Sequence, residues 1–146
     1  MKKFIIAFAA VAMFISASAF SGTKNGDNPA LATFQNTFKG ALDVKWGEEN
    51  DIITASFVLN NTRAVAYFSS TGELLGTARN ILFNQLPLLV VAEINKRYAT
   101  ASVYDITEYT LGSETFYIMQ VTLPTKTLKL RVSSAGDINV EKKTKR

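Results

Sequence analysis

The chain has 146 residues, with 16 Lys and Arg, 12 Asp and Glu, and neither His nor Cys. The lack of His and Cys excludes Ser-His-Asp and Cys-His nucleophilic sites, disulfides, and zinc sites built on imidazole or thiolate. The densest acidic group, Glu48-Glu49 with Asp51, is interpreted as a solvated turn, because a Ca²⁺ site needs six or more oxygen ligands held by a shaped loop. The sequence therefore predicts a protein that is not an enzyme and holds no metal or cofactor.

Residues 1–19 have the composition of a secretory signal peptide. Two lysines precede an apolar run at 4–15, and the small residues Ala17 and Ala19 fit a cleavage site directly after position 19. The apolar run would span about 18 Å as a helix, short of the roughly 30 Å of a hydrocarbon core, which disfavours a membrane anchor. With no Cys, a lipid-modified N-terminal Cys is also excluded. We expect a periplasmic or secreted protein without a membrane span.

Removal of residues 1–19 leaves 127 residues (146 minus 19), a size typical of one domain. Two of the 16 basic residues leave with this segment, so the charge of the remainder falls to about +2 (14 minus 12). Much of the remaining basicity lies in the tail at 142–146, which we interpret as solvated. No basic face is evident elsewhere, so the sequence predicts no nucleic-acid partner.

The first predicted elements are a flexible lead-in at 20–27 and a short helix. Asn28 is expected to cap this helix and Pro29 to occupy its first turn. The apolar residues at helical spacing are Leu31, Phe34 and Phe38. Gly40 then ends the helix.

Alternating and β-branched residues predict strands through most of the remaining chain. Four strands are expected after the first helix, around 43–46, 52–59, 62–68 and 73–81. A second helix is expected over 86–98, because Pro87 in its first turn costs no hydrogen bond. Four more strands are expected at 102–110, 114–123, 126–133 and 137–141.

One segment of the chain occurs twice. The segment Ala64–Leu74 returns 64 positions later (136 minus 72) as Leu128–Ile138, and each copy reads as a strand, a Ser-Ser-x-Gly-acid turn and a further strand. Such self-similarity predicts one unit used twice. We therefore predict an α+β fold, a tandem α-β4 repeat with units at about 28–81 and 82–141 in a single domain of residues 28–146. The expected sheet is antiparallel, with the helices packed on one face.

The same shift aligns two sets of apolar positions, which we place against the helices. They are Ile53, Ala55, Phe57, Leu59, Ala64, Ala66 and Phe68, aligned with Tyr117, Met119, Val121, Leu123, Leu128, Leu130 and Val132. The opposite face then carries many apolar and aromatic residues, among them Tyr67 and Phe116. A monomer seldom leaves so large an apolar surface in water without a use for it.

Several short motifs together resemble a known family. They are the helix with Phe34 and Phe38, then Val44-Lys45-Trp46, Ala66-Tyr67-Phe68, Thr71–Leu75, Thr77-Ala78-Arg79, and the helix from Leu86-Pro87 to Tyr98. This pattern resembles the PepSY-like family of exported proteins, also described as β-lactamase-inhibitor-like. The resemblance implies a tandem α-β4 fold like that of the β-lactamase inhibitory protein, in which a concave sheet grips a protein partner. That inhibitor is disulfide-bonded and this chain has no Cys, so no inhibitory residue is carried over.

The function we expect is that of a non-enzymatic exported binding module, which holds a protein or peptide on its open sheet face. Aromatic and Arg side chains usually anchor such contacts, and the candidates are Trp46, Tyr67, Phe116 and Arg131. In one alternative the same face is buried in a homodimer. In another the protein carries an apolar small ligand between sheet and helices, in a cavity lined by Phe57, Met119, Leu31, Phe34 and Phe38.

Overall fold

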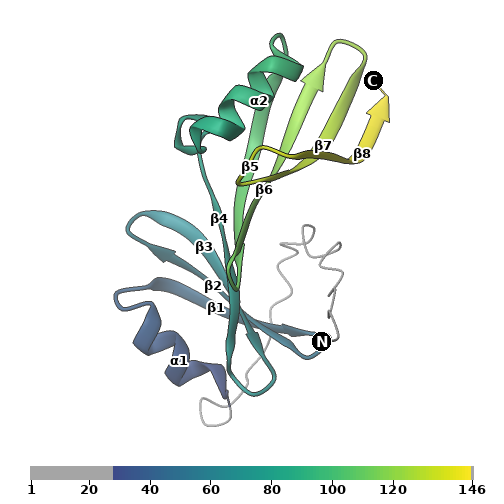
Figure 1. Cartoon of the computed structure of the whole chain (residues 1–146). Helices are drawn as coiled ribbons and strands as arrows, with labels where there is room; N and C mark the ends of the chain where they lie inside the picture. Colours follow the sequence, from purple (N-terminus) through teal and green to yellow (C-terminus); the bar gives the residue numbers. More distant parts are fainter. Residues whose placement is uncertain (1–27, 146) are drawn as a thin grey trace.

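The structure is a computed structural model that describes residues 28–145. The predicted signal peptide and lead-in, at 1–19 and 20–27, lie outside the described residues. Two α-helices and a short 3-10 helix accompany eight strands, which form one antiparallel sheet in chain order (Figure 1). The elements are α1 (Ala30–Thr37), β1 (Leu42–Glu49), β2 (Ile52–Leu59), β3 (Thr62–Ser69), β4 (Leu74–Asn80), η1 (Phe83–Gln85), α2 (Leu88–Tyr98), β5 (Ser102–Leu111), β6 (Glu114–Leu123), β7 (Lys126–Ser133) and β8 (Ile138–Lys145).

The predicted fold class, an α+β fold built as a tandem α-β4 repeat, is wrong. Strands account for 57% and helices for 19% of the structure, and the eight strands belong to a single sheet. The predicted boundary between units falls where β4 pairs with β5. In this ladder Arg79 and Glu108 face each other and form an ion pair of 2.7 Å. Continuous backbone pairing thus makes the middle of the sheet as regular as its two ends.

Both helices pack on the same face of this sheet. The Oδ1 atom of Asn28 accepts a hydrogen bond from the N–H of Ala30 at 3.0 Å where α1 begins, as expected of a capping residue. Pro87 was predicted within the first turn of the second helix and instead directly precedes α2, which begins at Leu88. Helix α1 buries Phe34 against β2 and β3, while α2 buries Val90 and Ile94 against β6 and β7. Figure 1 shows the sheet curving around its other face, which neither helix covers. We call this uncovered surface the open face.

Two turns of similar sequence, β3–β4 and β7–β8, lie against the helices. In the β3–β4 turn the backbone N–H of Glu73 donates to Ser69 Oγ, and in the β7–β8 turn that of Asp137 donates to Ser133 Oγ. Each turn has a glycine at positive φ, and Gly72 packs against the backbone at the start of α1. The hydroxyl of Thr33 also donates to the Gly72 carbonyl at 2.9 Å. The Ser-Ser-x-Gly-acid segments are therefore supports for the helices.

The apolar residues form two separate clusters, one beneath each helix. The cluster under α1, which we call the N-terminal cluster, has Ala30, Phe34, Ile53, Ala55, Phe57, Ala66 and Phe68 as its buried members. The cluster under α2, the C-terminal cluster, has Ile81, Leu86, Val90, Ile94, Ile106, Tyr117, Met119, Val121, Leu128, Leu130 and Val132. The predicted helix-facing positions are confirmed, because all of them lie in or against these two clusters.

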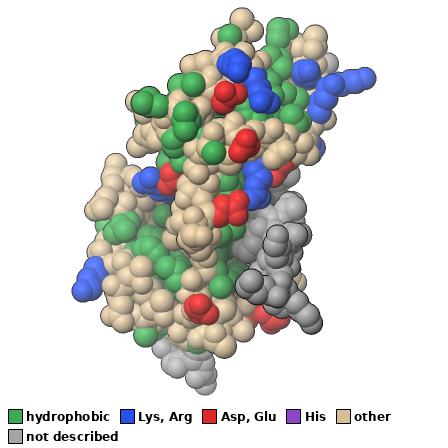
Figure 2. Space-filling view, viewed as in Figure 1, with side chains coloured by type: hydrophobic (Ala, Val, Ile, Leu, Met, Phe, Trp, Pro, Cys, Tyr) green, Lys and Arg blue, Asp and Glu red, His purple; other side chains and the backbone are tan. Residues whose placement is uncertain are grey.

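The basic C-terminal segment is a strand. The sequence predicted that strand pairing would stop near residue 141, but β8 continues to Lys145 and pairs with β7 along its length. The hydrogen-bonding edge of β7 explains the extension, because it offers backbone partners that a solvated tail would leave unused. The pairing places Lys126 opposite Lys145 and Lys129 opposite Lys142. Figure 2 shows Lys and Arg side chains gathered at the upper end of the view, near the ends of α2 and β8.

Candidate functional site: the open face of the sheet

The open face has an aromatic row at its centre. Side chains of opposed residues in neighbouring strands lie on the same face, so Ala78, Tyr109 and Phe116 share one side of β4, β5 and β6. The Tyr109 and Phe116 rings stack, with centroids 5.2 Å apart and planes 7° from parallel. Tyr67 of β3 lies on the same side, since it alternates with the helix-facing Phe68 and Ala66.

The guanidinium group of Arg131 extends this row. The guanidinium carbon of Arg131 lies 3.6 Å from the centroid of the Phe116 ring, which is a cation–π contact. Its Nη2 atom also donates to Glu114 Oε1 at 3.3 Å. The Arg131 side chain keeps 33% of its surface exposed and Glu114 keeps 66%. A partner can therefore reach a charged pair that is already held in place by an aromatic ring.

Tyr67 and Tyr109, on the open face, are neutral at physiological pH. Burial raises the pKa of Tyr67 to about 12, with a smaller contribution from Tyr109. The pKa of Tyr109 is also raised, first by burial and then by the negative charge of Glu141. The charges near the row come instead from ion pairs, Arg131 with Glu114 and Lys129 with Glu141 at 3.4 Å. The open face thus combines a neutral aromatic centre with charged groups at its side.

The structure brings together three of the four residues predicted for partner binding. Tyr67, Phe116 and Arg131 lie on the open face, and the first two are only 4% exposed. Their rings therefore support the surface, while Arg131 offers more of its own surface to solvent. Trp46 lies on the opposite side, with its ring centroid 5.2 Å from that of Phe34 and 6.1 Å from that of Phe68.

Two features of this arrangement were missed in the sequence. Tyr109 was not singled out, although its alternation with Glu108 and Thr110 along the strand carries the signal. The side of the sheet on which Trp46 lies was also missed, and the length of the β1–β2 turn carries that signal. Asn50 and Asp51 both have positive φ and form a two-residue turn, which makes Trp46 pair with the helix-facing Ala55.

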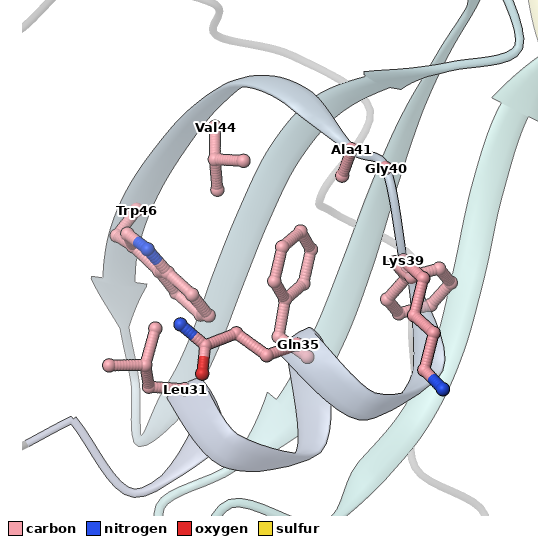
Figure 3. A pocket seen from close by; sticks show the side chains of 9 residues that line it. Leu31, Gln35, Lys39, Gly40, Ala41, Val44 and Trp46 are labelled. Atoms are coloured by element: carbon pink, nitrogen blue, oxygen red, sulfur yellow. The ribbon is translucent and has the colours of Figure 1, made fainter.

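A shallow pocket of about 350 Å³ lies between α1 and β1, at the border of the N-terminal cluster (Figure 3). Its lining residues are Leu31, Phe34, Gln35, Phe38, Lys39, Gly40, Ala41, Val44 and Trp46. The helix residues predicted for a ligand cavity do line it. The prediction that Phe57 and Met119 share that cavity is wrong, because Met119 lies in the C-terminal cluster under the other helix. Each helix covers its own cluster, and Phe57 and Met119 belong to different ones.

The described residues 28–145 offer no group of three or more acidic residues placed to hold a metal ion. In the same part of the chain, no helix has the length and apolar character needed to cross a membrane.

No family model matches the chain, and no curated protein matches its sequence. The fold is nevertheless similar to solved structures of proteins from Bacteroides. A DUF2874 family protein from Bacteroides ovatus ATCC 8483 is 18% identical, with 85% of this chain and 89% of that chain covered and a TM-score of 0.70. A BLIP-like protein from Bacteroides fragilis NCTC 9343 is 17% identical, with 85% and 89% covered and a TM-score of 0.68.

A third structure, of a protein from Bacteroides eggerthii DSM 20697 assigned to the periplasm, is 14% identical, with 81% of this chain and 87% of that chain covered and a TM-score of 0.69. At such identities the likeness shows the fold alone. It supports the β-lactamase-inhibitor-like part of the resemblance noted in the sequence, and it gives no support to the PepSY-like part.

Proposed function

We propose that the protein is a non-enzymatic, exported binding module that holds a protein or peptide partner on the open face of its sheet. The observation that carries this proposal is the Tyr109–Phe116–Arg131 stack, in which a partly exposed cation is fixed over a buried aromatic ring. Export is supported by the predicted signal peptide at 1–19 and by the periplasmic assignment of one structural neighbour.

The physical reason is that binding costs less when the contacting groups are already ordered. Arg131 is held by Phe116 on one side and by Glu114 on another, so little side-chain freedom remains to be lost in a complex. Arginine and aromatic residues are also the side chains that most often dominate interface energies. The partner best suited to this surface presents a carboxylate to Arg131 beside an apolar contact. Neither a homodimer nor an identified partner follows from the fold, and both are outcomes of the experiment.

The proposal is tested by affinity capture from envelope extract, with mass spectrometry of the captured proteins. Wild-type protein is compared with Arg131→Glu, and Arg97→Glu serves as the matched control. Arg97 lies on α2, away from the open face, and also has a carboxylate partner, Glu93 at 3.6 Å. We expect a partner that is retained by wild type and Arg97→Glu and lost by Arg131→Glu. Equal capture by all three variants would contradict the proposal, and capture of the protein's own copies alone would assign the face to a homodimer.

A further inference from the structure

Strand β1 is an open edge of the sheet, since β2 is its only pairing partner among the described strands. The two-residue turn at Asn50 and Asp51, with φ of 49° and 64°, has the type I′ form, which makes Glu49 and Ile52 a hydrogen-bonded pair. Hydrogen-bonded and non-bonded pairs alternate along an antiparallel ladder. The N–H and C=O groups of Trp46 and Glu48 are therefore directed away from β2, toward the free edge.

The pocket between α1 and β1 lies beside this free edge. Trp46 contributes to the pocket from β1, and Leu31 and Gln35 contribute from α1, as Figure 3 shows. An extended chain placed alongside β1 would present alternate side chains to the helix-bearing side of the sheet. A side chain opposite Trp46 would then enter the pocket beneath α1, and one two positions away would lie opposite Glu48.

We infer that this edge and its pocket form a second docking site, for an extended peptide that adds to the sheet as a ninth strand. Backbone hydrogen bonds to Trp46 and Glu48 hold such a peptide, and alternate side chains give the selectivity. The preferred pattern is a bulky apolar residue opposite Trp46 and a Lys or Arg two positions away, opposite Glu48, since opposite charges across strands are favourable. This site lies on the other side of the sheet from the open face and does not depend on the function proposed for it.

Charge argues for a foreign peptide as the occupant and against a second copy of the chain. When β1 is aligned antiparallel over its full length with another β1, Asp43 falls opposite Glu48. When β1 is aligned in the same way with β8, Lys142 falls opposite Lys45. Like charges directly opposite each other destabilise strand pairing. The lysines of β8 also protect that edge, as charged residues do on natural edge strands.

The test uses the fluorescence of Trp46, which is the only tryptophan in the chain and lines the pocket. Protein purified after expression of the full chain is titrated with acetyl-Thr-Lys-Thr-Phe-Thr-Lys-Thr-amide. This sequence offers Lys at the required distance from Phe in either strand direction. We expect a saturable change in Trp46 emission below about 1 mM peptide. The control peptide with Ser in place of Phe should give none, and no saturable change with the Phe peptide would overturn the proposal.

Variants at Glu48 separate the backbone contribution from the charge. Glu48→Pro removes an outward N–H while leaving the hydrogen-bonded pairs with β2 in place, as proline does on edge strands. We expect it to weaken peptide binding about tenfold or more, with a much smaller loss for Glu48→Gln. If Glu48→Pro does not fold, Glu48→Lys provides the test. This variant should bind a peptide that has Glu in place of both Lys residues, and it should no longer bind the Lys-containing peptide. Unchanged affinity for the Lys-containing peptide in Glu48→Pro or Glu48→Lys would contradict the peptide site. So would a wild-type dimer that Glu48→Pro abolishes, because the edge would then be an interface between copies of the chain.

Discussion

The two helix-covered clusters are built from similar elements but differ in their side chains and in how completely they are packed. Under α1, aromatic rings meet edge to face or at tilted angles, with Phe34 touching Phe38, Trp46, Phe57 and Phe68, and the packing stops at a shallow pocket. Under α2, every buried residue except Tyr117 is Ile, Leu, Val or Met. Six of them are at most 1% exposed: Val90, Ile94, Met119, Val121, Leu130 and Val132. The chain thus closes one cluster and leaves the other open at its border.

This difference has a geometric basis. Helix α1 has eight residues and α2 has eleven, so α1 covers less of the sheet beside it. Side chains in a well-packed core interdigitate with few voids, whereas the rings Phe34, Phe38 and Trp46 border the pocket between α1 and β1. The N-terminal cluster also borders the free edge strand β1, while the C-terminal cluster borders the edge strand β8, which carries several lysines. The C-terminal part of the molecule is therefore expected to contribute more stability, and the N-terminal part to be more open to ligands.

The largest expected effect comes from equal truncations in the two clusters. Leu130→Ala, at a fully buried position, should reduce the free energy of unfolding by about 2–5 kcal/mol. Leu31→Ala, at the border of the pocket, should cost less than about 1.5 kcal/mol, because part of that side chain already contacts solvent. Urea unfolding of both variants measures the difference. Equal losses would show that the two clusters are equally well packed.

The turn glycines give the next effect. Gly72 and Gly136 have φ of +87° and +93°, so an alanine at either position costs about 1–2 kcal/mol from backbone strain. At Gly72 the added methyl would also overlap the backbone of Pro29, whereas at Gly136 it meets the flexible Glu93 side chain at 3.1 Å. Gly72→Ala should therefore be the more destabilising, by roughly 1–3 kcal/mol. Thermal unfolding of both variants provides the measurement, and the opposite order would show that the α1 contact yields easily.

Alkaline pH tests the burial of Tyr67 on the open face. The pKa of Tyr67 is raised to about 12 in the folded state, above the usual 10, so the folded protein holds this proton more tightly than the unfolded chain. Its contribution to stability is fully present below pH 10 and is lost as the pH rises from 10 toward 12. Tyr67→Phe should flatten this loss, and Tyr104→Phe, at an exposed position, should not. Stability is measured by denaturant unfolding at pH 9, 10.5 and 11.5, and identical profiles would contradict the burial of the Tyr67 hydroxyl.

The smallest effect concerns the lysine-rich edge. Lys145→Glu would replace a like-charge pair with Lys126 by an opposite-charge pair, which should stabilise the protein by about 0.2–1 kcal/mol at low salt. The gain should shrink at 1 M salt, where charges on the surface are screened. Thermal unfolding at the two salt concentrations tests this, with Lys39→Glu on the α1 side as the control. A gain that does not depend on salt would show that the pairing cost is not electrostatic.

The sequence predicted individual elements better than their assembly. The bounds of β2, β6 and β7 are as expected, because strict alternation between turn residues defines both the strand and its faces. The pairing of β4 with β5 could not be predicted, since the segment between them holds a helix and alternation does not identify a strand's neighbour. The fold class was wrong for this reason. The lysines of β8 were read as a solvated tail, because local composition does not reveal that β7 offers a hydrogen-bonding edge.

The candidate site was predictable only in part. The 64-residue repeat, together with the alternation of side chains along each strand, placed Tyr67, Phe116 and Arg131 on one face. The position of Trp46 depends on the register of the β1–β2 ladder. The first strand was predicted around 43–46, whereas β1 continues to Glu49, and this extension sets the register. The stacking of Arg131 on Phe116 depends on rotamers that no sequence pattern specifies.

The most direct test of the proposed function is photo-crosslinking in cells that express the full chain. A photoreactive phenylalanine analogue at Gln120, on the open face, is compared with the same analogue at Asn95, on the exposed side of α2. Binding on the open face predicts a covalent adduct with another protein from position 120 and none from position 95. An adduct from position 95 alone would place the partner on the helices and contradict the proposed function.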